Sequence, residues 1–146
     1  MRHFYVINGP NLNLLGQRDP DIYGSFTYEA LVHAIDDHAK ASSVRVSHFQ
    51  SNHEGDLIDW LQQADKENIT GVLLNAGAFT HYSYALHDAI EAIQVPVIEI
   101  HLSDISRRKE SWRHTSVIAP VVEQTFQGEG LDSYRKGIDY LLKKHV

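Results

Sequence analysis

The sequence GVLL at residues 71–74 and the sequence VPVI at residues 95–98 decide the fold. Each is a short and uninterrupted apolar run, which is typical of a strand that is buried on both faces of a sheet. A strand covered on both faces needs helices on both sides, so the two runs favour a parallel α/β sheet.

Further elements alternate along the chain on either side of these runs. Three more stretches rich in β-branched or aromatic residues predict strands, at residues 4–7, 44–49 and 116–122. Apolar residues at helical spacing predict four helices, around residues 31–35, 57–64, 86–93 and 131–142. The alternation predicts right-handed βαβ units and hence a flavodoxin-like three-layer α/β sandwich with a five-stranded parallel sheet. Neither a repeat nor a linker interrupts it, so we expect residues 1–146 to form a single domain.

Composition excludes several classes of protein. The 146 residues include no cysteine, which excludes disulfide frameworks, thiolate metal sites and cysteine nucleophiles. Thirteen Lys and Arg against nineteen Asp and Glu give a net charge of −6, which argues against a nucleic-acid partner. No apolar run approaches the roughly 18 residues of a membrane span, and the first residues do not read as a signal peptide. We therefore expect no membrane partner and a cytoplasmic location.

The segments that follow the predicted strands are polar. In doubly wound sheets a ligand binds beyond the carboxyl ends of the strands, near the point where the strand order reverses. The segments at this end are residues 8–24, 50–55, 75–81 and 101–103. Hydrogen-bonding groups therefore lie where a ligand is expected.

The longest departure from periodicity, residues 16–24, predicts a lid, because it is bracketed by glycines and stiffened by a proline. One interpretation pairs Arg18 with Tyr23. A free phenol, with a pKa near 10, is ionised in only about one molecule in a thousand at pH 7, and a neighbouring guanidinium can lower such a pKa by roughly 1–3 units. The pair would then supply a phenolate base. The alternative is that Tyr23 packs on the surface while Arg18 pairs with Asp19 or Asp21.

Glu99, His101 and Ser103 alternate at the end of the fourth predicted strand, so all three are expected on one face. A buried carboxylate and imidazole are costly unless they pair. Glu99 would accept a hydrogen bond from one ring nitrogen of His101 while the other nitrogen faces a ligand, which suits a general acid. A purely structural His–Glu pair is the alternative.

Thr80 and His81 are expected to begin a helix directly after the turn Asn75-Ala-Gly. His81 and Asp88 are seven residues apart, which places them on one stripe of such a helix, facing the strand ends or a neighbouring subunit. The alternatives are a water-exposed His81 and an Asp88 that is solvated or at an interface.

Metal and nucleotide sites find no support in the spacing of the residues. Ten histidines are present, but none is arranged as a zinc motif, and no dinucleotide fingerprint or Walker loop follows a strand. A phosphoacceptor receiver domain of the same architecture needs carboxylates where this chain has Asn8, Asn11 and Asn75. A flavin-binding or interaction module is the second hypothesis, and the absence of a phosphate-cradling Ser/Thr-Gly loop after the first strand speaks against it.

Four motifs in order resemble those of the type II 3-dehydroquinate dehydratases, at residues 7–24, 50–55, 74–81 and 97–103. The resemblance covers nearly the whole chain. It implies a flavodoxin-like fold, a homo-oligomer assembled as a dodecamer of four trimers, and the third step of the shikimate pathway. The implied reaction is a cofactor-free and metal-free anti elimination of water from 3-dehydroquinate through an enolate, giving 3-dehydroshikimate.

The resemblance also implies residue roles. Tyr23 would remove the proton at C2, Arg18 would hold it as phenolate, and Asn11 would position the group that stabilises the enolate oxygen. His101, supported by Glu99, would protonate the departing C1 hydroxyl. The implied substrate-binding residues are Asn75, His81, Leu102, Ser103, Arg113 and, across a trimer contact, Asp88.

The chain departs from the family after Ser103, where the stretch leading to the expected carboxylate-binding arginine is one residue longer. This shift leaves Arg107 and Arg108 as alternatives for that role. Arg113 is preferred because the run from Trp112 to His114 matches an aromatic-Arg-His run of the family.

Overall fold

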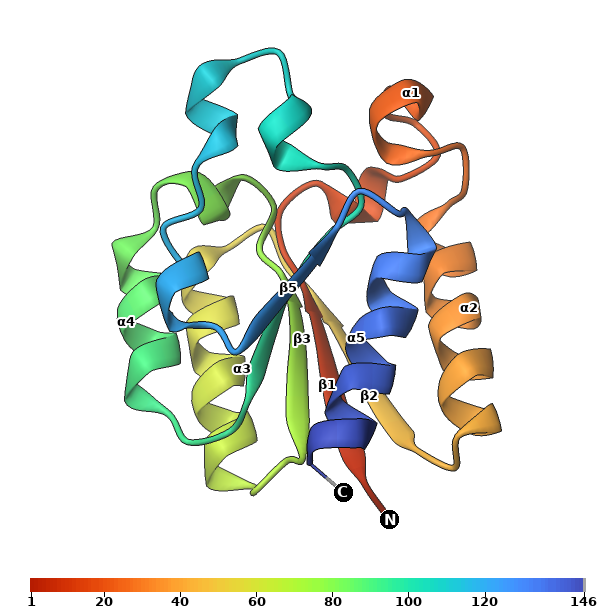
Figure 1. Ribbon diagram of the computed structural model, residues 1–146, viewed down its shortest axis with the longest axis vertical. Coiled ribbons are helices and arrows are strands. Elements are labelled where there is room, and N and C mark those ends of the chain that lie inside the picture. The colour runs from red at the N-terminus through yellow and green to blue at the C-terminus, as the bar shows by residue number, and fades with distance from the viewer. Residues whose placement is uncertain (146) are drawn as a thin grey trace.

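The computed structural model describes residues 1–145 and contains a five-stranded, entirely parallel sheet (Figure 1). The strands are β1 (His3–Asn8), β2 (Arg45–Gln50), β3 (Gly71–Asn75), β4 (Val97–His101) and β5 (Gln124–Gln127). Their order in the sheet is β2-β1-β3-β4-β5. This is the flavodoxin-like order, and it confirms the predicted fold class.

Two pairs of helices cover the sheet, one pair on each face. The helices are α2 (Tyr28–Ala41) and α5 (Leu131–Lys144) on one face, and α3 (Glu54–Lys66) and α4 (Tyr84–Ala92) on the other (Figure 1). Side chains along β1 alternate between the layers: Phe4 and Val6 pack in the α2/α5 core, whereas Tyr5 and Ile7 pack in the α3/α4 core. The period of two that defines a strand thus produces a three-layer sandwich.

The fifth strand was predicted at the wrong place. Residues 116–122 form a loop with a short 3-10 turn, η5 (Ala119–Val121), that contains Pro120. The loop is apolar because it contributes to the core: Ile118 is fully buried against α3 and α4. The true strand, β5, lies at the edge of the sheet beside β4 and has the polar sequence QTFQ, so no apolar run marks it.

The strand order in the sheet reverses between β1 and β3. These strands are adjacent, yet β1 leads to α2 on one face and β3 leads to α4 on the other, so the connections that follow them diverge and a crevice is expected beyond the sheet edge. The two ends approach closely: the Gly9 N–H donates to the Asn75 carbonyl at 2.7 Å, and a Cβ at Gly9 would lie 2.6 Å from the Ala76 carbonyl oxygen.

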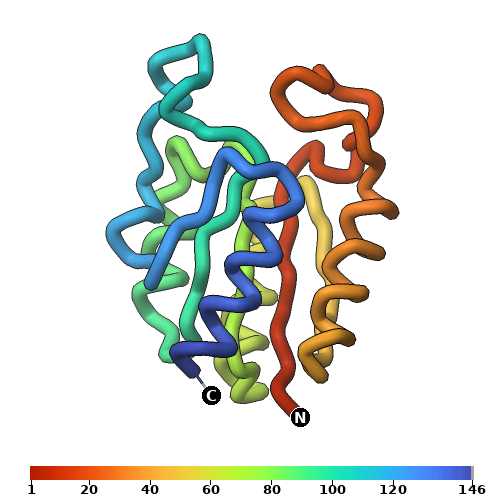
Figure 2. The backbone as a smooth tube through the Cα atoms, turned by 45° about the vertical axis from the view of Figure 1, so that its right-hand side comes forward, coloured from red at the N-terminus to blue at the C-terminus, as the bar shows by residue number. Residues whose placement is uncertain are grey.

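Two segments project above this crevice on opposite sides (Figures 1 and 2). One is the lid, residues 16–24, which follows η1 (Leu12–Leu14) and contains the one-turn helix α1 (Pro20–Tyr23). The other, here called the flap, is residues 104–114 and contains the turns η3 (Ile105–Arg107) and η4 (Ser111–His114).

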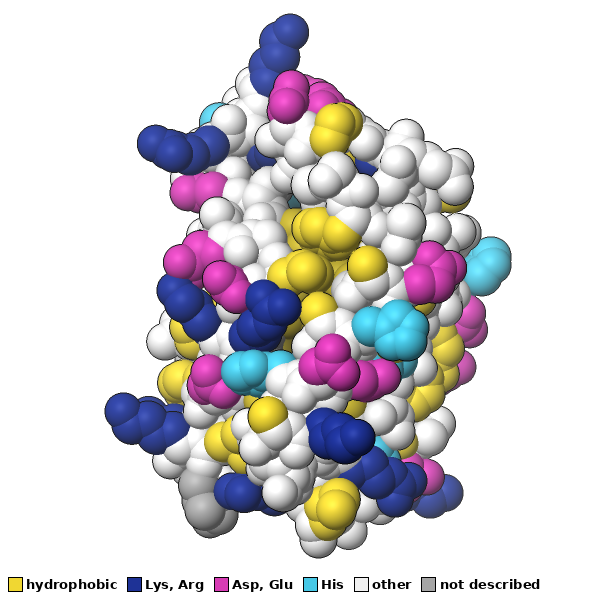
Figure 3. Space-filling model, turned by 90° about the vertical axis from the view of Figure 1, so that its right-hand side faces the viewer, with side chains coloured by type: hydrophobic (Ala, Val, Ile, Leu, Met, Phe, Trp, Pro, Cys, Tyr) yellow, Lys and Arg dark blue, Asp and Glu magenta, His cyan; other side chains and the backbone are white. Residues whose placement is uncertain are grey.

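The side of the molecule that carries α2 shows acidic, basic and histidine side chains interspersed (Figure 3). One histidine joins the two helices of this layer, because His38 Nε2 on α2 lies 2.7 Å from Asp139 Oδ1 on α5. Within residues 1–145, no helix has the length and apolar character needed to cross a bilayer.

Candidate active site

A pocket lies in the crevice at the carboxyl ends of β1, β3 and β4, between the lid and the flap. Nine of the predicted site residues line it: Asn11, Arg18, Tyr23, Asn75, His81, His101, Leu102, Ser103 and Arg113. The remaining lining residues are Pro10, Leu12, Gly77, Ala78, Ile105 and Arg108. The polar segments that follow different strands therefore meet in one place.

The pocket is cationic although the chain as a whole is acidic. Three arginines, Arg18, Arg108 and Arg113, and two histidines, His81 and His101, contribute to its lining. Among the described residues, 1–145, no aspartate or glutamate lines it. Such a lining suits a ligand that carries a carboxylate, because a local field can favour an anion that the net charge of −6 would repel.

The hydroxyl of Tyr23 is contacted by two guanidinium groups. Arg18 Nη2 donates to Tyr23 Oη at 2.7 Å, and Arg108 Nη2 donates to the same oxygen at 2.8 Å. The Arg18 guanidinium also lies over the tyrosine ring, with Cζ 3.7 Å from the ring centroid. Two guanidinium groups thus donate to one phenol oxygen, and each of these hydrogen bonds is charge-assisted.

The alternative pairing of Arg18 with an aspartate of the lid is wrong. The side chain of Asp19 instead caps α1, where its Oδ1 accepts from the Asp21 N–H at 3.0 Å. Pro20 occupies the first helical position, where its missing N–H costs nothing. This cap and proline fix the helical turn whose last residue is Tyr23.

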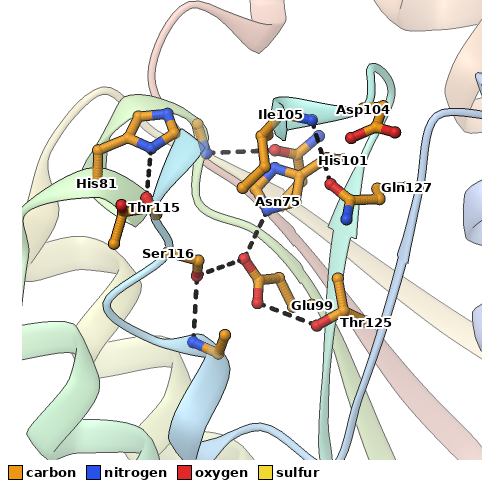
Figure 4. A network of polar contacts seen from close by, with 12 residues as sticks. Asn75, His81, Glu99, His101, Asp104, Ile105, Thr115, Ser116, Thr125 and Gln127 are labelled. Carbon is orange, nitrogen blue, oxygen red and sulfur yellow. Dashed lines mark hydrogen bonds and ion pairs between the residues drawn. The ribbon is translucent and has the colours of Figure 1, made fainter. Parts of the chain in front are cut away.

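Glu99 and His101 form a buried pair on β4 (Figure 4). His101 Nε2 lies 2.6 Å from Glu99 Oε2, so the other ring nitrogen, Nδ1, is left for the pocket that His101 lines. The hydroxyls of Ser116 and Thr125 also donate to the Glu99 carboxylate, at 2.7 Å and 3.1 Å. Burial alone would raise the pKa of Glu99, but the hydrogen bond and charge of His101, joined by these two hydroxyls, bring it below its ordinary value.

His81 does not begin a helix, contrary to the expectation from its sequence position. It ends the 3-10 turn η2 (Gly77–His81), and α4 begins three residues later at Tyr84, after the cap Ser83. His81 Nδ1 lies 2.8 Å from the Thr115 carbonyl oxygen (Figure 4). A carbonyl can only accept, so Nδ1 carries the proton and Nε2 is free to accept from a ligand.

The electrostatic surroundings keep His81 neutral. Partial burial lowers its pKa from the ordinary 6.5, and the bond to Thr115 offsets only part of that change. The nearby positive groups, His101, Arg113 and Arg108, lower the pKa further. A neutral imidazole with a fixed tautomer therefore lines the pocket.

Asp88 lies apart from this pocket and does not share a helical stripe with His81, because the two residues belong to different elements. Its side chain is 78% exposed and lies 3.1 Å from His87 Nδ1. Among residues 1–145, His87, Asp88 and Glu91 are the group whose side chains lie close enough together to hold a metal ion, and they lie outside the pocket lining. A role of Asp88 in a neighbouring subunit's site stays a prediction.

Two asparagines of the pocket are held by neighbours. Asn75 Nδ2 donates to the hydroxyl of the fully buried Tyr134 at 2.9 Å, and Asn75 Oδ1 accepts from the Gly77 N–H at 3.2 Å. Asn11 has a left-handed backbone with φ of 69°, and its N–H donates to Asn52 Oδ1 at 3.0 Å. Asparagine tolerates this conformation better than most side chains.

The flap brings two arginines to the pocket rather than one. Arg108 and Arg113 both line it, whereas Arg107 does not. Arg113 Nε lies 3.1 Å from Glu110, and Arg108 Nη1 lies 3.5 Å from the Ser103 hydroxyl, which is beyond the end of β4 rather than on it. Which arginine holds a carboxylate stays a prediction.

Sequence reasoning missed several partners of these groups. Arg108 was considered for a carboxylate but not as a partner of Tyr23, and Ser116, Thr125 and Tyr134 were not singled out. Each lies 17 or more residues from the group it contacts, so no local pattern marks the pair. The polar residues at the end of a buried strand were the signal that was available.

The fold and the pocket together define a class of protein. It is a flavodoxin-like α/β protein that carries a paired phenol and a paired imidazole in one cationic pocket at its topological switch point. Such an arrangement suits acid–base chemistry on a small anionic molecule.

Comparison with known proteins places the chain more narrowly: it belongs to the class II dehydroquinase family, whose model matches residues 2–142. It is 49% identical over 144 residues to a 3-dehydroquinate dehydratase of Bacillus pumilus, covering 99% of this chain and 97% of that protein. It is 51% identical over 143 residues to the same-named protein of Halalkalibacterium halodurans, covering 98% and 97%. A type II dehydroquinase of Butyrivibrio crossotus superposes with a TM-score of 0.94 at 44% identity, covering 97% of each chain.

Proposed function

We propose that this chain is a 3-dehydroquinate dehydratase, in which residues 1–146 act as one catalytic domain of the shikimate pathway. Family membership supports the activity, since the relatives at about half identity carry that name. The single observation that carries the mechanism is the Tyr23 hydroxyl held between the guanidinium groups of Arg18 and Arg108. A tyrosine hydroxyl held in this way can act as a base that removes a proton from the substrate.

In the proposed reaction Tyr23, as phenolate, removes a proton from C2 of 3-dehydroquinate. The electron pair of that C–H bond moves toward the neighbouring ketone and forms an enolate. Arg18 and Arg108 stabilise the phenolate before the transfer, when the negative charge is on the tyrosine oxygen. Asn11 helps to position the donor or water that stabilises the enolate oxygen.

The imidazole of His101 completes the elimination. The enolate expels the C1 hydroxyl, the C–O bond breaks with its electron pair on oxygen, and His101 Nδ1 supplies the proton that makes the leaving group water. Glu99 accepts from Nε2 throughout and stabilises the charged ring. In this proposal Tyr23 and His101 act on opposite faces of the substrate ring, which gives an anti elimination through the enolate.

Substrate contacts come from the rest of the pocket. Asn75 and neutral His81 offer groups for the ring hydroxyls, Leu102 and Ser103 offer backbone and hydroxyl groups, and Arg113 offers a cation for the carboxylate. Arg108 remains the alternative for that carboxylate.

A turnover assay tests the proposal. Adding 3-dehydroquinate should produce the absorbance of a conjugated enone, and the rate should survive both EDTA and borohydride. Tyr23→Phe should abolish the absorbance change while the variant stays folded by circular dichroism. Inactivation by borohydride in the presence of substrate would instead reveal an imine and would overturn the enolate mechanism.

We also propose a homo-oligomer, a dodecamer built as four trimers, in which Asp88 reaches a neighbouring subunit's pocket. Three large apolar side chains that a single chain leaves exposed support an interface: Tyr82, Tyr84 and Trp112 are 58%, 69% and 53% exposed. Light scattering after size exclusion would measure the mass, and a monomer with full activity would contradict the proposal. The cytoplasmic location expected from the sequence stays a prediction.

A further inference from the structure

We propose that Ser116 and Thr125 are positioning residues that set how readily His101 gives up its proton, acting through Glu99. The inference rests on the proposed function and adds two residues to it. Neither residue lines the pocket. Both donate to the Glu99 carboxylate, and Figure 4 shows His101, Ser116 and Thr125 converging on it.

The direction of the Ser116 hydrogen bond is fixed by its surroundings. Ser116 Oγ accepts from the Ala119 N–H at 3.1 Å, where the 3-10 turn η5 begins. The same oxygen lies 2.7 Å from Glu99 Oε2. Because an ionised carboxylate can only accept, the hydroxyl proton must point at Glu99. A backbone N–H, a hydroxyl and a carboxylate therefore form a chain that ends at His101 Nε2.

Thr125 acts on the other carboxylate oxygen. It is the residue of β5 directly opposite Glu99 in the sheet, and its Oγ1 donates to Glu99 Oε1 at 3.1 Å. Glu99 has no exposed surface, so protein groups must replace the water that would otherwise solvate its charge. His101, Ser116 and Thr125 together satisfy both oxygens, and their directions hold the carboxylate in one orientation.

The consequence concerns the strength of the acid. Each hydroxyl that donates to Glu99 draws part of the negative charge away from His101. With both hydroxyls donating to Glu99, we expect the protonated imidazole to transfer its Nδ1 proton more readily. Transfer of that proton to the departing hydroxyl forms an O–H bond, breaks the N–H bond and leaves a neutral ring still donating from Nε2 to Glu99.

Other charged or titratable groups face His101 from the surrounding elements. They are Glu99 on β4, His81 on η2, Arg18 and Tyr23 of the lid, and Arg108 and Arg113 of the flap. Apart from Glu99, none of these groups is hydrogen-bonded to Ser116 or Thr125. A shift in the pH profile of such a variant therefore reports the Glu99 contact.

The experiment measures kcat and KM for 3-dehydroquinate from pH 5 to pH 10 in Ser116→Ala and Thr125→Val. Each variant should move the alkaline limb of the kcat profile to higher pH by about 0.5 unit, with a further shift in the double variant. The plateau kcat should fall by up to about threefold in each single variant, because a more tightly held proton is a poorer general acid. KM should change less than about twofold, since neither side chain lines the pocket.

Thr125→Ser is the matched control, because it removes the methyl group and keeps the donor. Thr125→Ser should retain the alkaline limb of the wild-type kcat profile. Ser116→Thr, which also keeps a hydroxyl beside Glu99, should retain it as well. A second readout is the titration of the His101 ring nitrogens by ¹⁵N NMR, which should move in the same direction as the kinetic limb.

Two results would overturn the inference. One is a loss of kcat with an unmoved or lowered alkaline limb, which would mark a purely structural role. The other is a Thr125→Ser profile that matches Thr125→Val. Failure of the wild-type protein to turn over 3-dehydroquinate would instead refute the proposed function, and the NMR titration of the variants would still test the link between the hydroxyls and His101.

Discussion

Arg108 Nη2 lies 2.8 Å from Tyr23 Oη, although the two residues are 85 positions apart in the sequence. Arg108 belongs to the flap and Tyr23 to the lid, so this hydrogen bond joins the two segments that project above the pocket. Arg18 reaches the same oxygen from within the lid. The phenol oxygen is therefore the point where a local and a distant guanidinium meet.

Replacing Arg108 with alanine should lower kcat by about 10- to 100-fold, because the phenolate form of Tyr23 loses one of two stabilising cations. Steady-state kinetics measures the loss. Arg107→Ala is the neighbouring control, and its side chain is outside the pocket lining. Equal losses in the two variants would contradict the assignment of Arg108.

Replacing His81 with glutamine should raise KM more than it lowers kcat, because Nε2 of the neutral ring accepts from a substrate hydroxyl in our proposal. In the wild-type protein KM should rise as the pH falls below the ordinary histidine value of 6.5, when the ring gains a proton and loses its acceptor. Because burial lowers the pKa of His81, this rise should begin below 6.5 rather than at it.

His33→Gln on the exposed face of α2 is the control for loss of a histidine, and it should leave KM and its pH dependence as in the wild type. A His81→Gln variant whose KM still rises at low pH would show that another group causes the effect.

Replacing Tyr134 with phenylalanine should lower the free energy of unfolding by about 2–4 kcal/mol. The change removes the hydroxyl that donates to Asn8 at 2.5 Å and accepts from Asn75 at 2.9 Å, and it leaves both amides buried without that partner. Urea unfolding measures the loss. Tyr140→Phe, on the same helix but outside the fully buried network, should cost less than about 1 kcal/mol. Similar losses in the two variants would show that the buried network contributes little.

Strands of the fold were predictable to the extent that they are buried. β3 and β4 are covered on both faces, so their sequences must be apolar and could be recognised. β5 lies at the edge, where half-exposed glutamines are acceptable, and the nearest apolar run belonged to the buried loop around Ile118 instead. An apolar run in the sequence therefore indicates which residues are buried, but it does not indicate which residues pair as a strand.

Site residues were predictable where the partners are close in sequence. Arg18 and Tyr23 are five residues apart and share a lid, and Glu99 and His101 are two residues apart on a strand, so spacing alone brought each pair together. Partners supplied by another strand or by the flap depend on the register of the sheet and on loop paths, which local spacing does not specify.

The expected helical stripe joining His81 and Asp88 is wrong, and the sequence contains the signal that marks where the helix begins. Ser83 caps α4 by accepting from the Leu86 N–H at 3.0 Å, so the helix begins after His81 rather than at it. Serine is among the residues that commonly begin a helix in this way.

The close approach of β1 and β3 leads to a prediction that concerns both stability and activity. A methyl group at Gly9 would lie 2.6 Å from the Ala76 carbonyl oxygen, which is a backbone atom and cannot move aside as the end of a flexible side chain could. Gly9→Ala should therefore lower the free energy of unfolding by about 1–3 kcal/mol. It should also reduce kcat, because the turn that carries Asn11 into the pocket begins at this residue.

Gly55→Ala supplies the matched control, since Gly55 lies in the first turn of α3 and a Cβ there has nothing within 4 Å. That variant should be neutral or stabilised by up to about 1 kcal/mol, because alanine favours a helix over glycine. Urea unfolding and steady-state kinetics on both variants test the pair. Equal stability and activity of Gly9→Ala and Gly55→Ala would contradict the prediction. That result would mean that the ends of β1 and β3 can move apart, and that the close contact between Gly9 and Ala76 does not determine the shape of the crevice.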